Sequence, residues 1–227
     1  MAAERKANAR GKRTVFIIDD HPIVREGLVQ LINREPDLVV CGQAEDTYGA
    51  VKAMESLKPD IAVADISLKG ADGMELIKNV KMRLPGLPVL VLSIHDESLY
   101  APRALRAGAL GYIMKQEATE NVLVALRRVL SGEIYLSERM ANKILQQFVG
   151  AGTTAQRFSV DRLSDRELEV FRLIGQGYGT RRIAQELRLS VKTVESYREH
   201  IKDKMTLSDA SELVQHAIRW VEQEKML

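Results

Sequence analysis

Five polar residues in the N-terminal half of the chain have the chemistry needed to accept a phosphoryl group. Three are the carboxylates Asp19, Asp20 and Asp65, each at the end of a short apolar run. Crowded carboxylates raise one another's pKa values unless a cation neutralises them, and Mg²⁺ takes few protein oxygens and keeps positions for phosphate. Asp65 could then attack phosphorus to form an aspartyl phosphate, with the metal and Lys115 balancing the charge of the transferred group. Ser93 could donate a hydrogen bond to the added phosphoryl oxygens.

Alternating β-type and helical segments would position these residues. The β-type runs are TVFIID (14–19), LVVCGQA (38–44), IAVADI (61–66), VLVLS (89–93) and GYIMK (111–115). Apolar residues at helical spacing cover residues 21–33, 47–57, 73–83, 99–107 and 119–130. This alternation predicts an α/β fold with a doubly wound parallel sheet that helices cover on both faces. The carboxyl ends of parallel strands share one edge, so the polar residues should meet there.

The order and spacing of these segments resemble the receiver domain of two-component response regulators. The resemblance covers residues 14 to about 131 and rests on the segments DD, DISLKGADG, LSIHDE and GYIMK. It implies a flavodoxin-like sheet of five strands in the order 2-1-3-4-5. By residue, it implies Asp65 as phosphoacceptor, Ser93 and Lys115 as phosphate sensors, Tyr112 as the aromatic switch, and Asp19, Asp20, Asp65 and the backbone carbonyl of Ser67 as the Mg²⁺ site.

Two positions of this domain leave alternatives open. The family usually has proline four residues after the phosphoacceptor, where this chain has Lys69. A cation there could alter the rigidity of the loop and add positive potential beside the phosphate, or it could point into solvent, which the rarity of buried lysine favours. Tyr112 could be ordinary core packing on the last strand, and the resemblance is what favours the switch.

The β-type runs stop in the C-terminal part of the chain. An amphipathic helix is predicted over residues 137–148, and the stretch GAGTTAQRFS that follows has linker composition. Four helical patterns come next, at residues 165–176, 180–187, 191–205 and 208–222. The predicted organisation is a basic flexible tail (1–13), an α/β domain (14–135), a linker containing the additional helix (136–158) and an all-α domain of four helices (159–227).

Local signals define the first two helices of the all-α domain. Ser164 and Glu167 have capping-box spacing, and Gly177 is predicted to end the helix that they begin. Thr180 is predicted to cap the next helix. A short turn then leads to a third helix with the inward stripe Val194, Tyr197, Ile201 and Met205. Two short helices joined by a tight turn fit a helix-turn-helix, although any small helical bundle has polar outer faces.

The segment that begins LSDRELEV and ends HIKDKM resembles the LuxR-type DNA-binding domain over nearly its full length. The resemblance rests on the LSxRE start, the IAxxL helix and the KTVxxY segment. It implies base-edge contacts by Glu195, Ser196 and Glu199 and phosphate contacts by Lys192, Thr193, Arg198 and Lys202. The final helix, with Leu213, Val214, Ala217 and Val221, resembles the element through which such domains pair, but covering the bundle core is an equally good interpretation.

Charge alone does not identify the DNA-binding half. Residues 159–227 carry twelve basic and twelve acidic residues, whereas residues 1–13 carry five basic residues and one acidic residue. Seven basic residues against four acidic residues between Arg181 and Lys204 must therefore offset the acids on the reading face. The basic tail could bind nucleic acid weakly, but a solvated extension is the plainer interpretation.

Composition indicates a globular protein that does not insert into a membrane. Hydrophobic residues make up 45% of the chain and charged residues 28%. No apolar run is long enough to span a membrane, the N-terminal segment lacks the apolar core of a secretory signal, and a single cysteine suits a reducing compartment. We therefore expect a cytoplasmic protein without a membrane partner.

The combined resemblance is to response regulators of the NarL/FixJ type. It implies a cognate histidine kinase that phosphorylates Asp65, sequence-specific binding to double-stranded promoter DNA, RNA polymerase as a further partner, and a homodimer when phosphorylated. No enzymatic activity is expected apart from Mg²⁺-dependent self-phosphorylation from a donor and slow autodephosphorylation. One rival interpretation is a metal-dependent phosphohydrolase, but that family carries DxDx[TV] at the nucleophile, whereas Asp65 lies in ADISL. Another is a DNA-binding protein whose receiver domain acts without phosphate.

Overall fold

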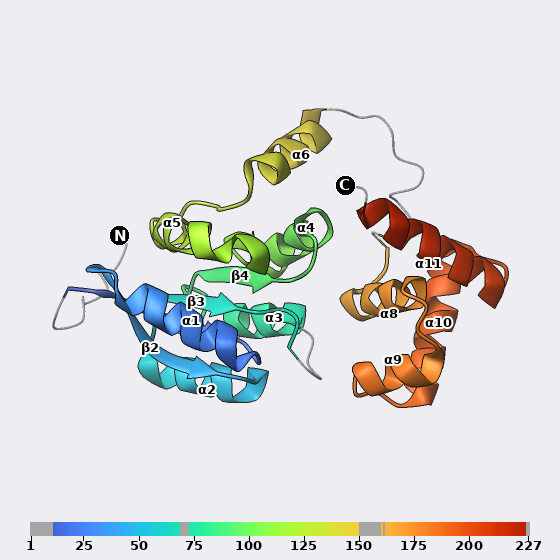
Figure 1. The fold of residues 1–227 in the computed structure, drawn as a ribbon, viewed down its shortest axis with the longest axis horizontal. Coiled ribbons are helices and arrows are strands. Elements are labelled where there is room, and N and C mark those ends of the chain that lie inside the picture. Colours follow the sequence, from blue (N-terminus) through green and yellow to red (C-terminus); the bar gives the residue numbers. More distant parts are fainter. Residues whose placement is uncertain (1–10, 69–72, 150–159, 161, 226–227) are drawn as a thin grey trace. The chain divides into compact units, whose positions relative to one another are not determined.

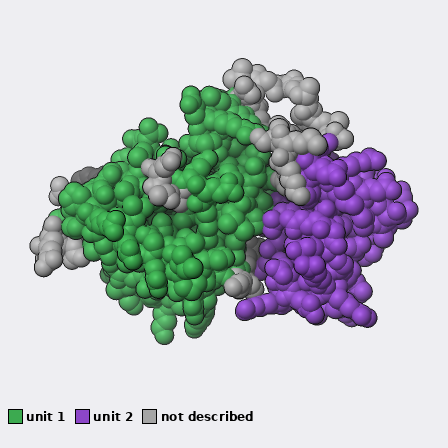
Figure 2. All heavy atoms as spheres, viewed as in Figure 1, with its two compact units in different colours: residues 1–147 green, residues 148–227 purple. Residues whose placement is uncertain are grey.

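The computed structural model describes residues 11–68, 73–149, 160 and 162–225 of the chain. The chain forms two compact units, Met1–Gln147 and Phe148–Leu227, which Figure 2 shows in green and purple. Lys69, most of the predicted basic tail and residues 150–158 of the predicted linker lie outside the described residues. In the described part of the chain, no helix has the length and apolar character of a membrane span.

A parallel sheet of five strands forms the centre of the first unit (Figure 1). The strands are β1 (Arg13–Ile18), β2 (Leu38–Ala44), β3 (Ile61–Ala64), β4 (Val89–Ser93) and β5 (Gly111–Met114). Their spatial order, β2-β1-β3-β4-β5, confirms the predicted flavodoxin-like topology. The direction of winding reverses between β1 and β3, and in such sheets ligands bind beyond the carboxyl ends of the strands at this reversal.

Helices alternate with the strands of the first unit, continue after β5 and follow the predicted segments closely. They are α1 (Pro22–Asn33), α2 (Thr47–Leu57), α3 (Gly73–Arg83), α4 (Glu97–Ala107), the short 3₁₀ helix η1 (Lys115–Glu117), α5 (Ala118–Leu130) and α6 (Glu138–Val149). Side-chain caps explain two of the starts, because the carboxylates of Asp46 and Asp96 accept hydrogen bonds from backbone N–H groups in the first turns of α2 and α4. Gly108, in the left-handed conformation with φ 108°, ends α4.

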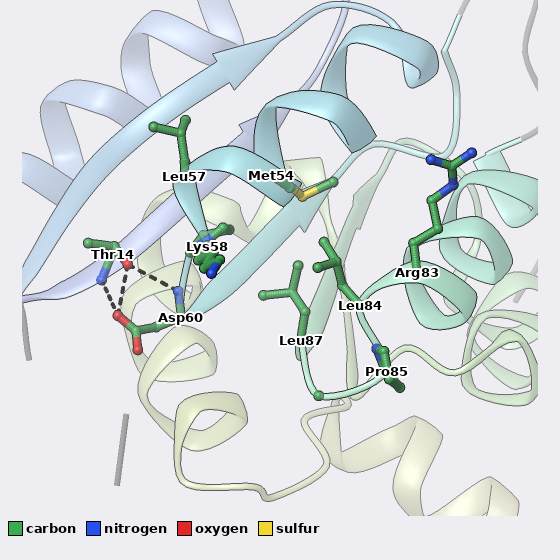
Figure 3. Close-up of a pocket in the computed structure, with 11 residues that line it drawn as sticks. Thr14, Met54, Leu57, Lys58, Asp60, Arg83, Leu84, Pro85 and Leu87 are labelled. Atoms are coloured by element: carbon green, nitrogen blue, oxygen red, sulfur yellow. Dashed lines mark hydrogen bonds between the residues drawn. The ribbon is translucent and has the colours of Figure 1, made fainter. Parts of the chain in front are cut away.

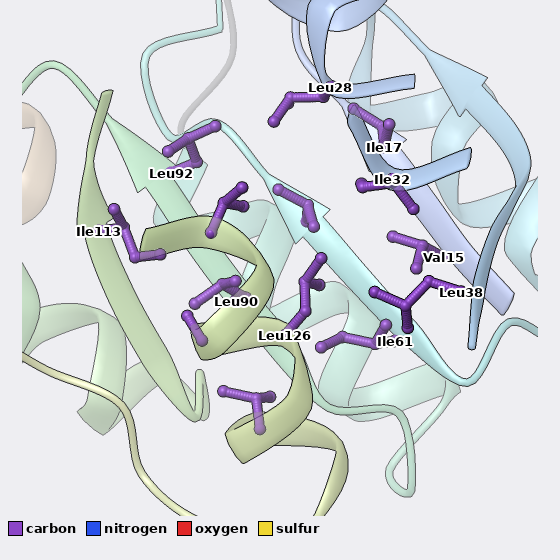
Figure 4. Close-up of a cluster of buried hydrophobic side chains, with 14 residues drawn as sticks. Val15, Ile17, Leu28, Ile32, Leu38, Ile61, Leu90, Leu92, Ile113 and Leu126 are labelled. Atoms are coloured by element: carbon purple, nitrogen blue, oxygen red, sulfur yellow. The ribbon is translucent and has the colours of Figure 1, made fainter. Parts of the chain in front are cut away.

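One apolar core cluster of the first unit lies between a face of the sheet and helices α1 and α5 (Figure 4). Alternate strand residues such as Val15 and Ile17 point into this core, which also contains Leu126 of α5. Phe16, between these two strand residues, is fully buried as well. Burial of each large aliphatic side chain stabilises the fold by roughly 1.5–3 kcal/mol before conformational entropy is subtracted.

A close backbone contact fixes the start of α3. A Cβ atom on Gly73 would lie 2.2 Å from the Cα atom of Ile66, a distance that no side chain tolerates. Glycine at this position therefore lets α3 begin directly against the backbone that follows Asp65.

The segment after α5 extends the β5 edge of the sheet. The N–H of Tyr135 donates to the carbonyl of Leu110, and the carbonyl of Tyr135 accepts from Tyr112, both at 2.9 Å. Two residues later, the N–H of Ser137 donates to Glu97 Oε1 at 2.9 Å, and the Ser137 hydroxyl donates to Glu97 Oε2. The residue before α6 is thus joined to the first turn of α4.

In the described part of the second unit the structure is helical, as predicted. Its helices are α8 (Asp165–Gly175), α9 (Thr180–Glu186), α10 (Val191–Met205) and α11 (Ala210–Lys225). The capping box of Ser164 and Glu167 is confirmed, and Gly177 follows α8 with φ 85°. The prediction that Thr180 caps α9 is wrong, because Gly179 occupies the cap position without a side-chain bond and Thr180 is already helical. Because Gly179 takes the extended conformation of the cap residue, Thr180 is the first residue of the helix.

Helix α11 covers the core of its own unit. The side chains of Leu213 and Ala217 are fully buried, and a Cβ atom on Gly175 of α8 would lie only 2.3 Å from the carbonyl oxygen of Ala217. The rings of Phe171 and Trp220 also meet, with centroids 5.5 Å apart. The predicted apolar stripe of α11 therefore packs on α8.

Candidate functional site

The predicted pocket residues meet at the carboxyl edge of the sheet. Asp19 and Asp20 follow β1, Asp65 follows β3, Ser93 ends β4, and Lys115 begins η1 directly after β5 rather than ending the strand. Asp19 and Asp65 are each 1% exposed and Ser93 is fully buried. Charged groups this deep need partners, so their ion pairs and hydrogen bonds define the site.

The ammonium group of Lys115 lies between two of the carboxylates. Its Nζ is 2.7 Å from Asp65 Oδ2 and 2.8 Å from Asp19 Oδ2, and the Lys115 side chain is only 10% exposed. Burial acts to lower the pKa of Lys115, but the bonds to the two carboxylates outweigh it and hold the pKa above its ordinary value. Burial raises the pKa of Asp65, and the pairing with Lys115 offsets only part of that effect.

A chain of hydrogen bonds leads from Asp65 to Tyr112. The N–H of Ser67 donates to Asp65 Oδ1 at 2.7 Å, and the hydroxyl oxygens of Ser67 and Ser93 are 3.3 Å apart. The N–H of His95 donates to Ser93 Oγ at 3.1 Å, and the Tyr112 hydroxyl donates to the His95 carbonyl at 2.9 Å. Burial raises the pKa of Tyr112 well above its ordinary value, so the hydroxyl remains a donor. The predicted switch residue is thus connected to the pocket through His95.

His21 belongs to the pocket although no prediction placed it there. Its Nδ1 lies 2.8 Å from Asp20 Oδ1, 3.2 Å from Asp19 Oδ1 and 3.9 Å from Asp65 Oδ2. One potential ligand atom from each of these four residues lies within 4.8 Å of the others. The available signal was its position directly after the acidic pair. Three carboxylates beside one ammonium group leave excess negative charge, so this donor set fits a divalent cation.

A separate hollow of about 700 Å³ lies at the opposite edge of the sheet (Figure 3). Asp60 lines this hollow, and its Oδ2 accepts hydrogen bonds from the N–H and the hydroxyl of Thr14, both at 2.8 Å, while Arg13 pairs with Oδ1. Burial acts to raise the pKa of Asp60, but these donors hold it below its ordinary value. Asp60 therefore ties β1 to the start of β3, and no predicted site residue lines this hollow.

The second predicted site lies on α10. Its buried stripe is confirmed at Val194 and Ile201, which are fully buried, while Tyr197 and Met205 are half-buried. The predicted DNA contacts divide into exposed residues (Lys192, Glu195, Ser196 and Glu199) and half-buried residues (Thr193, Arg198 and Lys202). Lys202 Nζ lies 2.7 Å from Glu199 Oε2, so one of the two acids predicted to face base edges is paired within the helix.

Buried Glu167 fixes α10 against α8. Lys204 Nζ donates to Glu167 Oε1 at 2.9 Å and to Oε2 at 2.6 Å, and the Glu167 carboxylate also accepts from the backbone N–H of Ser164 at 2.7 Å. Burial acts to raise the pKa of Glu167, but the bonds from Lys204 and Ser164 hold it below its ordinary value. Sequence reasoning identified the cap but missed the ion pair, because the partners are 37 residues apart.

Comparison with known proteins assigns both units. Residues 15–127 match the model of the response regulator receiver domain, and residues 161–217 match that of the bacterial regulatory proteins of the luxR family. The oxygen regulatory protein NreC of Staphylococcus aureus is 35% identical over 211 residues, which cover 90% of this chain and 96% of NreC. The chain belongs to the NarL/FixJ-type response regulators.

Solved structures agree with this assignment of the response regulator. A LuxR-family response regulator from Aurantimonas is 32% identical, with a TM-score of 0.57. The match covers 61% of this chain and 99% of the Aurantimonas chain. A second structure is RcsB of Salmonella enterica serovar Typhimurium, bound to promoter rprA in the presence of the phosphomimetic BeF₃⁻. RcsB is 26% identical, with a TM-score of 0.61, and the match covers 91% of this chain and 98% of the RcsB chain. This response regulator therefore combines a receiver with a DNA-binding domain that acts in transcription regulation.

Proposed function

We propose that Asp65 is the phosphoacceptor of this response regulator and that a histidine kinase or a small phosphodonor supplies the phosphoryl group. The observation that carries the proposal is the buried Asp65 carboxylate, held 2.7 Å from Lys115 Nζ beside two further carboxylates. A carboxylate oxygen of Asp65 attacks phosphorus, an acyl phosphate forms, and the bond to the donor's leaving group breaks with its electron pair. Self-phosphorylation from a small donor follows the same step. In slow autodephosphorylation, water attacks phosphorus, the bond between phosphorus and the Asp65 oxygen breaks, and inorganic phosphate and the carboxylate are released.

The donor set fits Mg²⁺, which would be held by the carboxylates of Asp19, Asp20 and Asp65 and by the carbonyl of Ser67. When bound, the ion would neutralise charge on the transferring phosphoryl oxygens. The positive charge of Lys115 would neutralise phosphoryl charge in the same way. Its ammonium group already contacts Asp65, so a short movement would carry it to a phosphoryl oxygen.

The response would pass through Ser93. Its oxygen accepts from the His95 N–H and lies 3.3 Å from the Ser67 hydroxyl oxygen, so the Ser93 hydrogen becomes available to a phosphoryl oxygen once Ser67 donates in that contact or the contact breaks. Rotation of Ser93 toward Asp65 would weaken the His95 contact, and through His95 it would alter the bond made by Tyr112. Addition of charge at Asp65 is thereby proposed to shift Tyr112 and to favour a homodimer.

On the second unit we propose that α10 reads promoter DNA. Exposed Lys192 and the half-buried Thr193, Arg198 and Lys202 would contact phosphates, and Glu195, Ser196 and Glu199 would face base edges. RNA polymerase is proposed as a further partner at the promoter. The cytoplasm is proposed as the location, because a regulator with a DNA-binding domain acts where the promoter DNA lies.

DNA-site selection with and without a phosphodonor tests the proposal. Wild-type protein incubated with acetyl phosphate and Mg²⁺ should gain the mass of one phosphoryl group, form dimers and bind selected DNA more tightly. Asp65→Asn should show none of these three changes. If Asp65→Asn gains mass and affinity as the wild type does, Asp65 is not the acceptor. A selected site with two half-sites about one helical turn apart would match a dimer.

A further inference from the structure

The imidazole of His21 lies among the carboxylates of the acidic pocket. His21 is the cap residue of α1, and its own backbone N–H donates to Asp19 Oδ1 at 2.8 Å. The imidazole ring turns toward the acids, so that Nδ1 comes within 3.2 Å of Asp19 Oδ1 and within 2.8 Å of Asp20 Oδ1. The side chain is 47% exposed, which leaves it accessible to an ion that enters from solvent.

The spacing of these atoms resembles that of ligands around one ion. Ligands about 2.1 Å from an octahedral ion lie about 3.0 Å apart when adjacent and about 4.2 Å apart when opposite. The distances from His21 Nδ1 to the first two carboxylates, 3.2 and 2.8 Å, are near the adjacent value. The distance of 3.9 Å to Asp65 Oδ2 is near the opposite value. The imidazole thus stands in a ligand position relative to all three acids.

We propose that His21 is a direct metal ligand of this pocket and determines its metal selectivity, so that a transition ion such as Co²⁺ binds more tightly than Mg²⁺. The proposal deepens the proposed function and rests on it, because both place the ion among the same carboxylates. Oxygen ligands suit Mg²⁺, whereas imidazole suits transition ions that bind nitrogen well. A nitrogen ligand therefore adds affinity for Co²⁺ without a comparable gain for Mg²⁺.

Neighbouring groups of the chain orient this ligand set. The His21 N–H holds the Asp19 carboxylate, and Arg25 Nη1 donates to the Asp19 carbonyl at 2.5 Å. Such outer contacts fix ligands in place before an ion arrives. Lys115 Nζ lies 3.5 Å from His21 Nδ1 and shares two of the carboxylates, so an entering ion must displace this ammonium group. Because the ammonium group competes with every cation, it lowers the affinity for Co²⁺ and for Mg²⁺ alike. The ratio of the two affinities is therefore set by the metal ligands.

Titration calorimetry of the full chain with Co²⁺ alone and with Mg²⁺ alone tests the proposal. His21→Asn replaces the nitrogen by an amide oxygen and keeps a good helix cap. It should weaken Co²⁺ binding by at least about tenfold, because loss of an outer-shell contact alone costs that much, and it should change Mg²⁺ binding by no more than about twofold. A paramagnetically shifted imidazole N–H resonance should appear in the Co²⁺-loaded wild type and be absent from the variant.

The matched control is His200→Asn, which alters a 61% exposed histidine of the second unit and should leave both affinities unchanged. His21→Gln provides a second variant if His21→Asn loses the circular dichroism of the folded chain. An unchanged ratio of Co²⁺ to Mg²⁺ affinity, or a shifted resonance that survives in both variants, overturns the inference.

Mg²⁺-dependent mass gain from acetyl phosphate separates this inference from the proposed function. If the protein gains mass but the ratio of Co²⁺ to Mg²⁺ affinity is the same in wild type and His21→Asn, only the role of His21 is overturned. The expected change in ratio without mass gain overturns only phosphorylation. Failure of the wild type to bind either ion overturns the metal site in both.

Discussion

The hydroxyl group of Tyr112 donates a 2.9 Å hydrogen bond to the backbone carbonyl of His95, inside the first unit. The N–H of the same His95 donates to Ser93 Oγ at 3.1 Å. One backbone residue therefore joins the fully buried Tyr112 side chain to the hydroxyl proposed to sense phosphate. A change at either end must alter the position of His95 or break one of the two bonds, so the proposed switch would have a physical connection.

Removal of the Tyr112 hydroxyl tests this connection. Tyr112→Phe keeps the ring and its packing but leaves the His95 carbonyl without that donor. The free energy of unfolding should fall by about 0.5–1.5 kcal/mol, and the gain in DNA affinity on phosphorylation should shrink. Denaturant unfolding and fluorescence anisotropy with selected DNA, each with and without acetyl phosphate, measure the two effects. Tyr48→Phe, at an 84% exposed tyrosine, is the control and should change neither. A full affinity gain in Tyr112→Phe would show that the bond does not carry the signal.

The fold was predictable because its signals are local. Apolar strands such as Val89–Ser93 and helices with a buried stripe repeat along the chain, and their alternation leaves few possible topologies. The wrong cap assignment for Thr180 shows the limit of local reasoning, since Gly179 and Thr180 are both acceptable at a helix start and only the backbone distinguishes them.

The pocket was predictable at its strand ends but not around them. Asp65 and Lys115 could be placed because parallel strands bring their carboxyl ends to one edge. His21 was missed because a single histidine after two acids has no periodic signal. The bond between Glu97 and Ser137 was missed because its partners are 40 residues apart in the sequence. Neither residue type indicates a partner at that sequence separation.

The contact between Glu97 and Ser137 should control the start of α6. Glu97→Gln removes the charge that accepts the N–H of Ser137, and a bond to a charged group contributes about 1.5–3 kcal/mol. Amide hydrogen exchange near Met140 should therefore become at least about tenfold faster, because local opening costs less. Glu138→Gln, at the exposed neighbouring position, should leave the exchange rate unchanged. Equal rates in wild type and Glu97→Gln would show that other contacts hold the helix.

Loss of the ion pair between Glu167 and Lys204 should destabilise the second unit. Glu167→Gln removes a buried charge that accepts from Lys204 and from the Ser164 backbone, so the free energy of unfolding should fall by about 1–3 kcal/mol. Thermal unfolding of the full chain measures the loss. Glu199→Gln disrupts an ion pair whose carboxylate is 66% exposed, and its effect should stay below about 0.5 kcal/mol. Similar losses in the two variants would contradict a special role for Glu167.

The pH dependence of this ion pair follows from the direction of the pKa shift. The pKa of Glu167 in the folded protein lies below the ordinary value of 4.5, because the bonds from Lys204 and Ser164 outweigh burial. The carboxylate therefore contributes stability above that value, and the contribution is lost as pH falls through the lower folded pKa. The stability difference between wild type and Glu167→Gln should be full near neutral pH and shrink on acidification below 4.5. A constant difference from neutral pH to below the folded pKa would assign the loss to packing.

Two substitutions on α10 should separate phosphate contact from base reading. Lys192→Ala should weaken binding to all DNA sequences and reduce the slope of log affinity against log salt by about 0.9, the effect of one lost phosphate contact. Glu195→Ala should change the preferred base at one position, with a loss of about 1–3 kcal/mol in discrimination, because glutamate accepts from cytosine N4. Salt titrations and site selection distinguish the two results. Lys52→Ala on α2, an exposed lysine outside the DNA-binding unit, is the control for a general charge effect and should leave slope and preference unchanged. If Glu195→Ala only raises affinity for every sequence, Glu195 repels phosphate and does not read a base, and specificity must come from Ser196 or from the shape of the DNA.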